Sequence, residues 1–159
     1  MSEDKKVLLE VQKVKKEFVT SKSLTGKPLK IVHAVDSVDL TIYEGETIGV
    51  VGESGCGKST LGRCILQLIR PTAGNVLYRG EDITKLNKEQ MRQMRRKMQL
   101  IFQDPYASLN PRMTIGDIIA EPLDIQLKLS EKERMERVLK MMERVGLNTR
   151  YVNRYPHEF

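Results

Sequence analysis

The stretch "GVVGESGCGKSTL" constrains this chain more than any other part of its sequence. Residues Gly52–Ser59 have the spacing Gly-x-x-x-x-Gly-Lys-Ser, which needs a strand before the glycines and a helix after them. Thr47–Val51 is predicted to be a short buried strand, and Ser59–Ile69 a helix with leucine and isoleucine at helical spacing. An ordinary glycine turn would explain neither Lys58 nor the spacing. The sequence therefore predicts the strand, loop and helix of a P-loop.

This loop has the chemistry of a polyphosphate site. Glycines let the backbone approach an anion closely, and the N–H groups at a helix N-terminus attract it. Lys58 supplies a charge toward the β- and γ-phosphates, Ser59 a hydroxyl ligand for Mg²⁺, and Thr60 an α-phosphate contact. The loop residues predicted to bind the nucleotide are Gly52, Glu53, Ser54, Gly55, Cys56, Gly57, Lys58, Ser59 and Thr60.

Length and composition limit the class of protein and the compartment in which it is expected. The chain of 159 residues is about one domain long and has no apolar run that approaches about 18 residues, so no membrane span is expected. The N-terminus does not read as a secretory signal, and two cysteines make no disulfide framework, which favours a reducing cytosol. Cys56 is interpreted as a small tolerated loop residue, with a redox switch as the alternative. Metal binding by Cys56 and Cys64 is not expected, because no further Cys or His lies at ligand spacing.

Two blocks carry a resemblance to a known family. They are "EGETIGVVGESGCGKST" and "IFQDPYASLNPRMTIGDIIAEPL". Together they resemble the ATP-binding subunits of ABC transporters from about Leu8 to Phe159, and the second block is similar to the dipeptide and oligopeptide importer branch. The resemblance implies an α/β fold with an incomplete P-loop NTPase core of the ABC ATPase type. An N-terminal antiparallel β part and the start of a helical subdomain complete the expected fold.

The resemblance also implies roles for single residues. Phe18, in "VQKVKKEF", matches the aromatic that stacks on adenine, although a core aromatic at a strand end is the alternative. Gln103 matches a glutamine that ligates Mg²⁺ or positions water and links the nucleotide state to the membrane subunit; the alternative is a solvated polar residue. Lys58 and Gln103 are thus the implied catalytic residues, Ser59 and Gln103 the implied metal ligands, and ATP and Mg²⁺ the cofactors.

The partners implied by the resemblance are transmembrane permease subunits and a second ATP-binding subunit, as a homodimer or heterodimer. An extracytoplasmic solute-binding protein is implied indirectly. The expected location is peripheral, on the cytoplasmic face of the cell membrane, where ATP hydrolysis energises peptide import. The loop Tyr106–Leu109 and the start of the following helix are expected to face the permease.

The resemblance further implies that a signature motif follows "YPHEF", so that the chain corresponds to the N-terminal half of the intact subunit. The Walker B base and switch histidine would then lie beyond Phe159. We therefore expect this chain to bind nucleotide without turnover. We also expect marginal stability, because the strand Thr47–Val51 would lack parallel neighbours.

Three segments organise the chain. Residues 1–46 are predicted to be mainly β, with an alternating strand around Leu40, a turn at Glu44–Glu46, and a loop or hairpin tip in "TSKSLTGKPLKIV". Residues 47–111 contain the P-loop, a hairpin in "GNVLYRGEDI", a short helix near Lys88–Lys97 and a buried strand that ends at Gln103.

Residues 112–159 are predicted to be helical. Thr114 with Asp117 is interpreted as one cap, and Ser130 with Glu133 as a capping box. Gly146 is expected to end the second helix. The apolar stripe of that helix, interpreted as core, consists of Met135, Val138, Leu139, Met142 and Val145.

Two other function classes stay open at this point. The net charge of +6 and the cluster "RQMRRK" also suit a nucleic-acid-associated P-loop ATPase. No aromatic residue interleaves the cluster, so a solvated helical face and no nucleic-acid partner are favoured. The other class is a nucleotide-binding module without turnover.

Overall fold

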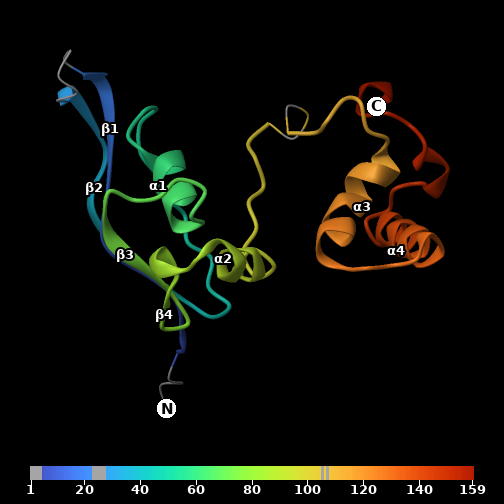
Figure 1. Cartoon of the computed structure of the whole chain (residues 1–159), viewed down its shortest axis with the longest axis horizontal. Helices are drawn as coiled ribbons and strands as arrows, with labels where there is room; N and C mark the ends of the chain where they lie inside the picture. Colours follow the sequence, from blue (N-terminus) through green and yellow to red (C-terminus); the bar gives the residue numbers. More distant parts are fainter. Residues whose placement is uncertain (1–4, 23–27, 105, 107) are drawn as a thin grey trace. The chain divides into compact units, whose positions relative to one another are not determined.

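The computed structural model describes residues 5–22, 28–104, 106 and 108–159. The chain divides into two compact units, Met1–Leu100 and Ile101–Phe159, and each is described by itself (Figure 1). None of the helices in the described ranges has the length and hydropathy of a membrane-spanning segment.

An antiparallel sheet forms the first unit, with strands in the order β2-β1-β3-β4 (Figure 1). The two long strands, β1 (Val7–Lys22) and β2 (Pro28–Tyr43), pair along their length, so the prediction that this region is mainly β is confirmed. Residues 23–27 of the expected hairpin tip lie outside the described residues. The predicted hairpin downstream is also confirmed, as β3 (Ala73–Tyr78) and β4 (Glu81–Asp82).

Two helices and one 3₁₀ turn accompany this sheet. Helix α1 (Lys58–Ile65) follows the glycine loop as predicted, but it ends earlier than Ile69, because Gln67 adopts a left-handed backbone with φ 54°. After η1 (Ile83–Lys85), a capping box of Asn87 and Gln90 starts α2 (Lys88–Met94). The basic cluster is solvent-exposed at and after the end of α2, as the predicted solvated face requires.

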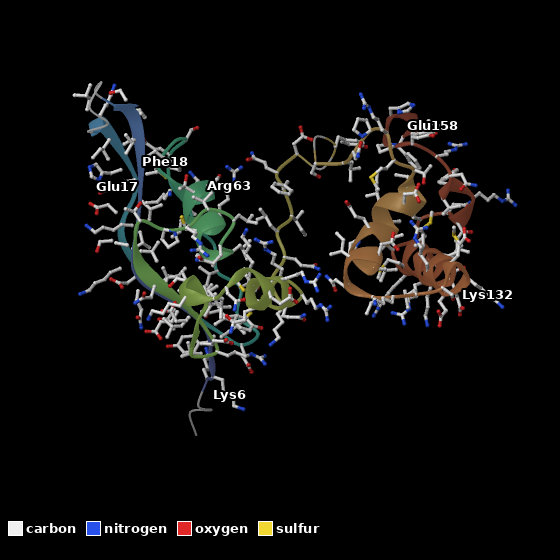
Figure 2. All side chains as sticks on the ribbon, in the orientation of Figure 1. Lys6, Glu17, Phe18, Arg63, Lys132 and Glu158 are labelled. Carbon is white, nitrogen blue, oxygen red and sulfur yellow. The ribbon has the colours of Figure 1, made fainter. Side chains whose placement is uncertain are left out.

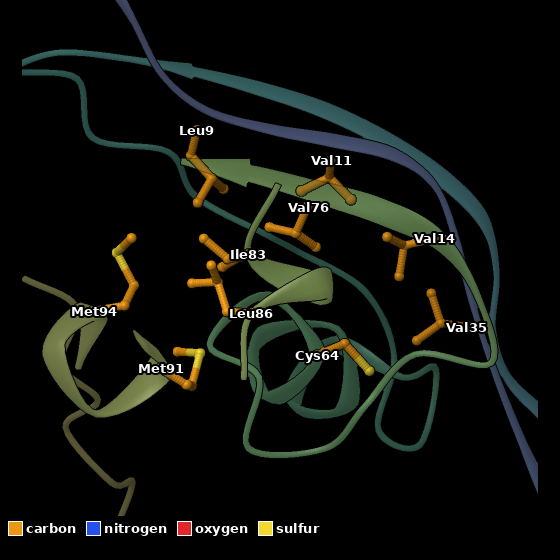
Figure 3. Close-up of a cluster of buried hydrophobic side chains, with 10 residues drawn as sticks. All are labelled: Leu9, Val11, Val14, Val35, Cys64, Val76, Ile83, Leu86, Met91 and Met94. Carbon is orange, nitrogen blue, oxygen red and sulfur yellow. The ribbon is translucent and has the colours of Figure 1, made fainter. Parts of the chain in front are cut away.

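The hydrophobic core of the first unit lies between one face of the sheet and these helices (Figure 3). Side chains alternate between the two faces of a strand, so Leu9 and Val11 of β1 both point into the core, and a register shift then brings Val14 to the same face. The helical segments supply the opposite wall of the core. Its buried members are Leu9, Val11, Val14, Val35, Cys64, Val76, Ile83, Leu86, Met91 and Met94.

Two expected buried strands are absent from the described residues. Thr47–Val51 is not a strand, and the side chain of Val51 is 95% exposed. The segment that ends at Gln103 is not a strand either, and Ile101 is 92% exposed. Both predictions are wrong for this structure. The physical reason is that an apolar segment becomes a buried parallel strand only when neighbouring strands pair with its backbone, and no described strand pairs with either segment.

The second unit is helical, as predicted. It contains α3 (Ile115–Gln126), α4 (Glu131–Arg144), η2 (Thr149–Tyr151) and η3 (Pro156–Glu158). The Thr114 hydroxyl caps α3 by accepting from the N–H of Asp117, at 3.2 Å. Ser130 and Glu133 form the predicted capping box of α4.

The apolar stripe of α4 forms the core of this unit. Val138 and Met142 are fully buried with Ala120 of α3, and Leu139 packs against them, so these three residues of the stripe are core as predicted. Met135 is half-buried. Val145 is the exception: it is the C-cap residue and is 69% exposed, because the chain leaves the helix there. Gly146 follows with φ 75° and ends the helix, as predicted.

Candidate phosphate-binding site

The glycine loop is held together by its own lysine. The Lys58 Nζ donates to the carbonyl oxygens of Gly52 and Glu53, both at 2.6 Å, and lies 3.5 Å from the Cys56 Sγ. A backbone hydrogen bond from the Cys56 N–H to the Glu53 carbonyl, at 3.3 Å, closes the turn of the loop. The ammonium group of Lys58 is therefore hydrogen-bonded to the backbone of the loop.

The end of the loop is anchored on the sheet. Lys16 of β1 pairs with Val35 of β2, and Glu17 of β1 pairs with His33 of β2. Ala34 of β2 is therefore an extra residue in a β-bulge. A Cβ built on Gly57 would overlap the carbonyl oxygen of this Ala34. Gly57 also has φ 96°, a left-handed conformation that favours glycine. Only glycine therefore fits where the loop meets the bulge.

The N-terminus of α1 suits an anion. Gly57 is its N-cap and has no side chain to accept from the first-turn N–H groups, and no acidic residue lies in the first turn. These groups carry the positive end of the helix dipole. Ser59 is exposed there and Thr60 half-buried, so both hydroxyls sit at the start of the helix. The residues present thus fit a phosphate group, with Lys58 as its cation.

Phe18 lies on β1, next to the part of β2 that contacts the end of the loop. It pairs with Val32 in the β1–β2 ladder, two residues from the bulge at Ala34, and this separation along a strand is about 7 Å. Phe18 is 39% exposed, and Figure 2 shows its side chain next to that of Glu17. The alternative of a buried core aromatic does not apply here. The site therefore brings an exposed aromatic ring close to the residue that anchors the loop.

Gln103 belongs to the second unit, in the irregular segment before α3, and its side chain is exposed. Its predicted role toward metal or water therefore stays a prediction. Among the described residues, no group of three or more His, Cys, Asp or Glu side chains is arranged to hold a metal ion.

The two cysteines have different surroundings. Cys56 is exposed in the loop, whereas Cys64 is fully buried on α1. Burial raises the pKa of the Cys64 thiol, and the positive charge of Lys16 acts in the opposite direction. The Lys16 Nζ donates to the carbonyl oxygen of Arg70, in the segment that follows α1, at 2.9 Å.

Sequence reasoning missed two residues of the site. Ala34 left no signal, because its contact with Gly57 depends on a bulge between two long strands. The position of Lys16 could have been predicted from the sequence, because Lys16 precedes Phe18 by two positions and residues two apart on a strand share one face.

Comparison with known proteins adds independent information. A family model described as "ABC transporter" matches residues 35–159. The oligopeptide transport ATP-binding protein OppF of Bacillus subtilis is 54% identical over 96% of this chain and 48% of its own length. OppF of Escherichia coli is 51% identical over 100% of this chain and 48% of its own length. The dipeptide transport ATP-binding protein DppF of Haemophilus influenzae is 49% identical, over 96% and 46%. The chain thus spans about half the length of the curated relatives it matches.

Solved structures agree in fold. The dimeric structure of MJ0796, a bacterial ABC transporter cassette, has a TM-score of 0.79 and 28% identity, over 96% of this chain and 63% of its own. A second structure of that cassette, in a post-hydrolysis state with ADP and Pi, matches with the same TM-score of 0.79. The described architecture, an antiparallel sheet with helices, is therefore consistent with an incomplete α/β P-loop ATPase core.

Proposed function

The chain belongs to the ABC transporter family, and we propose that its loop Gly52–Lys58 binds the phosphates of ATP. One observation carries the proposal: the Nζ of Lys58, the first residue of α1, lies 2.6 Å from two carbonyl oxygens of the loop, and no side chain caps the N-terminus of this helix. An anion that enters the loop meets an ammonium group and the first-turn N–H groups together. Phe18 is the proposed stacking partner of the adenine.

We propose Mg²⁺ as the second cofactor. The Ser59 hydroxyl and the Gln103 side-chain carbonyl are hard oxygen donors of the kind that Mg²⁺ prefers. When bound, the ion would neutralise charge on the phosphates. Within the first unit, the Ser59 hydroxyl at the start of α1 would hold the ion.

For the intact protein we propose that ATP binding and hydrolysis energise the import of oligopeptides or dipeptides. The support is the identity of about half of all positions with proteins named for that transport. The proposed partners are a second ATP-binding subunit and transmembrane permease subunits, with the chain on the cytoplasmic face of the membrane. The dimeric structure of the MJ0796 cassette supports the first of these partners.

The loop after Gln103 is the proposed contact with the permease. Tyr106 of this loop is 66% exposed, and Phe102, which precedes Gln103, is 49% exposed. Exposed aromatic residues on a loop beside a rigid unit are typical of binding segments. A cysteine placed at Ser108 of the intact subunit should crosslink to a cytoplasmic loop of the permease, whereas a cysteine at the exposed Lys132 of α4 serves as control. Equal crosslinking at both positions would contradict the contact.

The test of phosphate binding is a titration of the 159-residue chain with a fluorescent ATP analogue. Lys58→Ala should weaken binding roughly ten- to hundredfold, because it removes a charge-assisted contact. Lys88→Ala removes the same charge from the exposed start of α2 and should leave the affinity unchanged. Equal affinity of the Lys58→Ala variant and the parent chain would overturn the assignment.

A further inference from the structure

The ring of Phe18 has a charged neighbour on its own strand. The Lys16 Nζ lies over the ring, 5.1 Å from its centroid. The two residues are two positions apart on β1, so their side chains project from the same face of the sheet. A cation at this distance from an aromatic face is attracted by the ring quadrupole. One face of the Phe18 ring is therefore associated with a positive charge.

The position of this charge is fixed by the backbone that follows α1. The Lys16 Nζ donates to the Arg70 carbonyl oxygen at 2.9 Å. The adjacent segment is itself tied to β1, because the Thr72 N–H donates to the Lys15 carbonyl at 2.7 Å and the Glu17 N–H donates to the Thr72 hydroxyl at 3.0 Å. The ammonium group thus has two defined partners, a backbone carbonyl and an aromatic ring.

The ion pairs of the neighbouring residues do not involve this lysine. Lys15 forms an ion pair with Asp36 at 3.0 Å, and the Glu17 carboxylate lies 3.1 Å from the His33 Nδ1. In the part of the chain that the structure describes, no carboxylate forms an ion pair with Lys16. Lys16 is also half-buried, unlike most surface lysines. The ammonium group of Lys16 therefore contacts the ring of Phe18 instead of forming a solvated ion pair.

We propose that Lys16 is a positioning residue for base binding: its ammonium group covers one face of the Phe18 ring and holds the ring so that the opposite face receives a purine. The inference rests on the proposed function of Phe18. A ring that is already held in place loses less side-chain freedom when the base stacks on it. Lys16 itself makes no contact with the nucleotide phosphates in this scheme, so its effect is confined to ligands that carry a base.

The experiment compares two ligands on the complete 159-residue chain. A fluorescent ATP analogue labelled on the ribose reports binding of a ligand with a base. Inorganic tripolyphosphate, measured by its displacement of that analogue, reports binding at the loop alone. Lys16→Met keeps most of the apolar side chain and removes the charge, and Lys16→Arg keeps the charge. Lys15→Met removes a neighbouring charge that does not contact Phe18.

Lys16→Met should raise the dissociation constant for the ATP analogue about two- to fivefold, the size of an exposed cation–π contact. Lys16→Arg and Lys15→Met should leave it within about twofold. The affinity for tripolyphosphate should be unchanged in all three variants. In a Phe18→Ala background, Lys16→Met should have no further effect, since the ring that it positions is gone.

The possible failures are distinguishable. If the parent chain does not bind ATP, or if Phe18→Ala leaves ATP affinity unchanged, the proposed function of the loop or of Phe18 is wrong, and the inference falls with it. If Phe18→Ala weakens binding but Lys16→Met does not, or acts equally in both backgrounds, only the positioning role is overturned. Tighter ATP binding by Lys16→Met would also overturn it, because the lysine would then compete with the base for the ring. If Lys16→Met weakens the binding of tripolyphosphate as much as the binding of ATP, the substitution has caused a general loss of structure, and this result too would contradict the proposal.

Discussion

Gly57, the N-cap residue of α1, lies directly against the carbonyl group of Ala34 in β2. The contact joins the glycine loop to the sheet at a β-bulge, where β2 has one residue more than β1. Bulges often occur beside functional sites, where they redirect the backbone. Here the bulge sets the point at which the loop ends and the helix begins. The position of Lys58, one residue later, depends on it.

We predict that Gly57→Ala disrupts the loop. The substitution adds a Cβ that overlaps the Ala34 carbonyl and places alanine at φ 96°. The left-handed conformation alone costs about 1–2 kcal/mol, so we expect both a lower melting temperature and a large loss of nucleotide affinity. Gly55→Ala is the matched control, because Gly55 has φ 84° but no atom within 4 Å of an added Cβ. Equal effects of the two variants would show that the contact with Ala34 is unimportant.

A second prediction concerns the pH dependence of the helical unit. Asp117 accepts a hydrogen bond from the Thr114 hydroxyl at 2.7 Å and one from Arg134 at 3.1 Å. Both hydrogen bonds lower the pKa of the Asp117 carboxyl, and the one from Thr114 has the larger effect. Because the pKa of this carboxyl is lower in the folded chain than in the unfolded chain, the charged carboxylate stabilises the fold. This stabilisation is fully present above the ordinary aspartate pKa of about 3.9 and is lost as the pH falls through the pKa of the folded state.

Asp117→Asn should therefore be less stable than the parent at neutral pH, by less than about 1 kcal/mol, because solvent screens the half-exposed carboxylate. The difference should shrink below pH about 4. Urea unfolding at a series of pH values measures it. A difference that stays constant down to pH about 2 would contradict a role for the carboxylate charge.

The sequence predicted features that depend on near neighbours along the chain. Thr114 caps α3 through Asp117, and Ser130 caps α4 through Glu133, each three residues away. The glycine-lysine spacing likewise identified the loop before α1, although the roles of its residues toward nucleotide stay predictions. In each case the interacting groups lie within six residues of one another along the chain, so the local sequence contains the information needed.

The features that the sequence did not predict depend on distant parts of the chain. Val51 and Ile101 lie in apolar segments that were expected to be buried strands, yet burial of a strand requires partners that the sequence of the segment does not specify. The contact of Gly57 with Ala34 depends on a shift in pairing between β1 and β2. Val145 follows the helical spacing of the stripe but lies where the helix has already ended.

The exposure of Val51 leads to a third prediction. A side chain that is 95% exposed contributes little to folding, so Val51→Ala should change the free energy of unfolding of this chain by less than about 0.5 kcal/mol. Val11 of β1 is 1% exposed, and Val11→Ala should cost about 2 kcal/mol through lost burial and a cavity. Chemical denaturation of the two variants and the parent compares them directly. A large loss of stability for Val51→Ala would mean that the segment is a buried strand, as the sequence alone suggested.

The last prediction concerns the start of α3, where the chain after η2 meets the helix. The N–H groups of Ile115 and Gly116 donate to the carbonyls of Arg154 and Val152, both at 2.8 Å. A Cβ on Gly116 would lie 2.7 Å from the Val152 Cγ2 and 3.0 Å from the Val152 carbonyl oxygen. Gly116→Ala should therefore destabilise the helical unit by about 1–3 kcal/mol, the usual cost of overpacking. This is opposite in sign to the ordinary gain when alanine replaces a helical glycine.

Two variants test this reasoning by thermal unfolding followed by circular dichroism. Gly62 of α1 has no atom within 4 Å of an added Cβ, so Gly62→Ala should stabilise the chain by about 0.5–1 kcal/mol. Val152→Ala removes the Cγ2 atom but keeps the carbonyl oxygen, so adding it to Gly116→Ala should recover part of the lost stability. Stabilisation by Gly116→Ala, or the absence of any recovery in the double variant, would show that the helix start does not pack against Val152 as the structure places it.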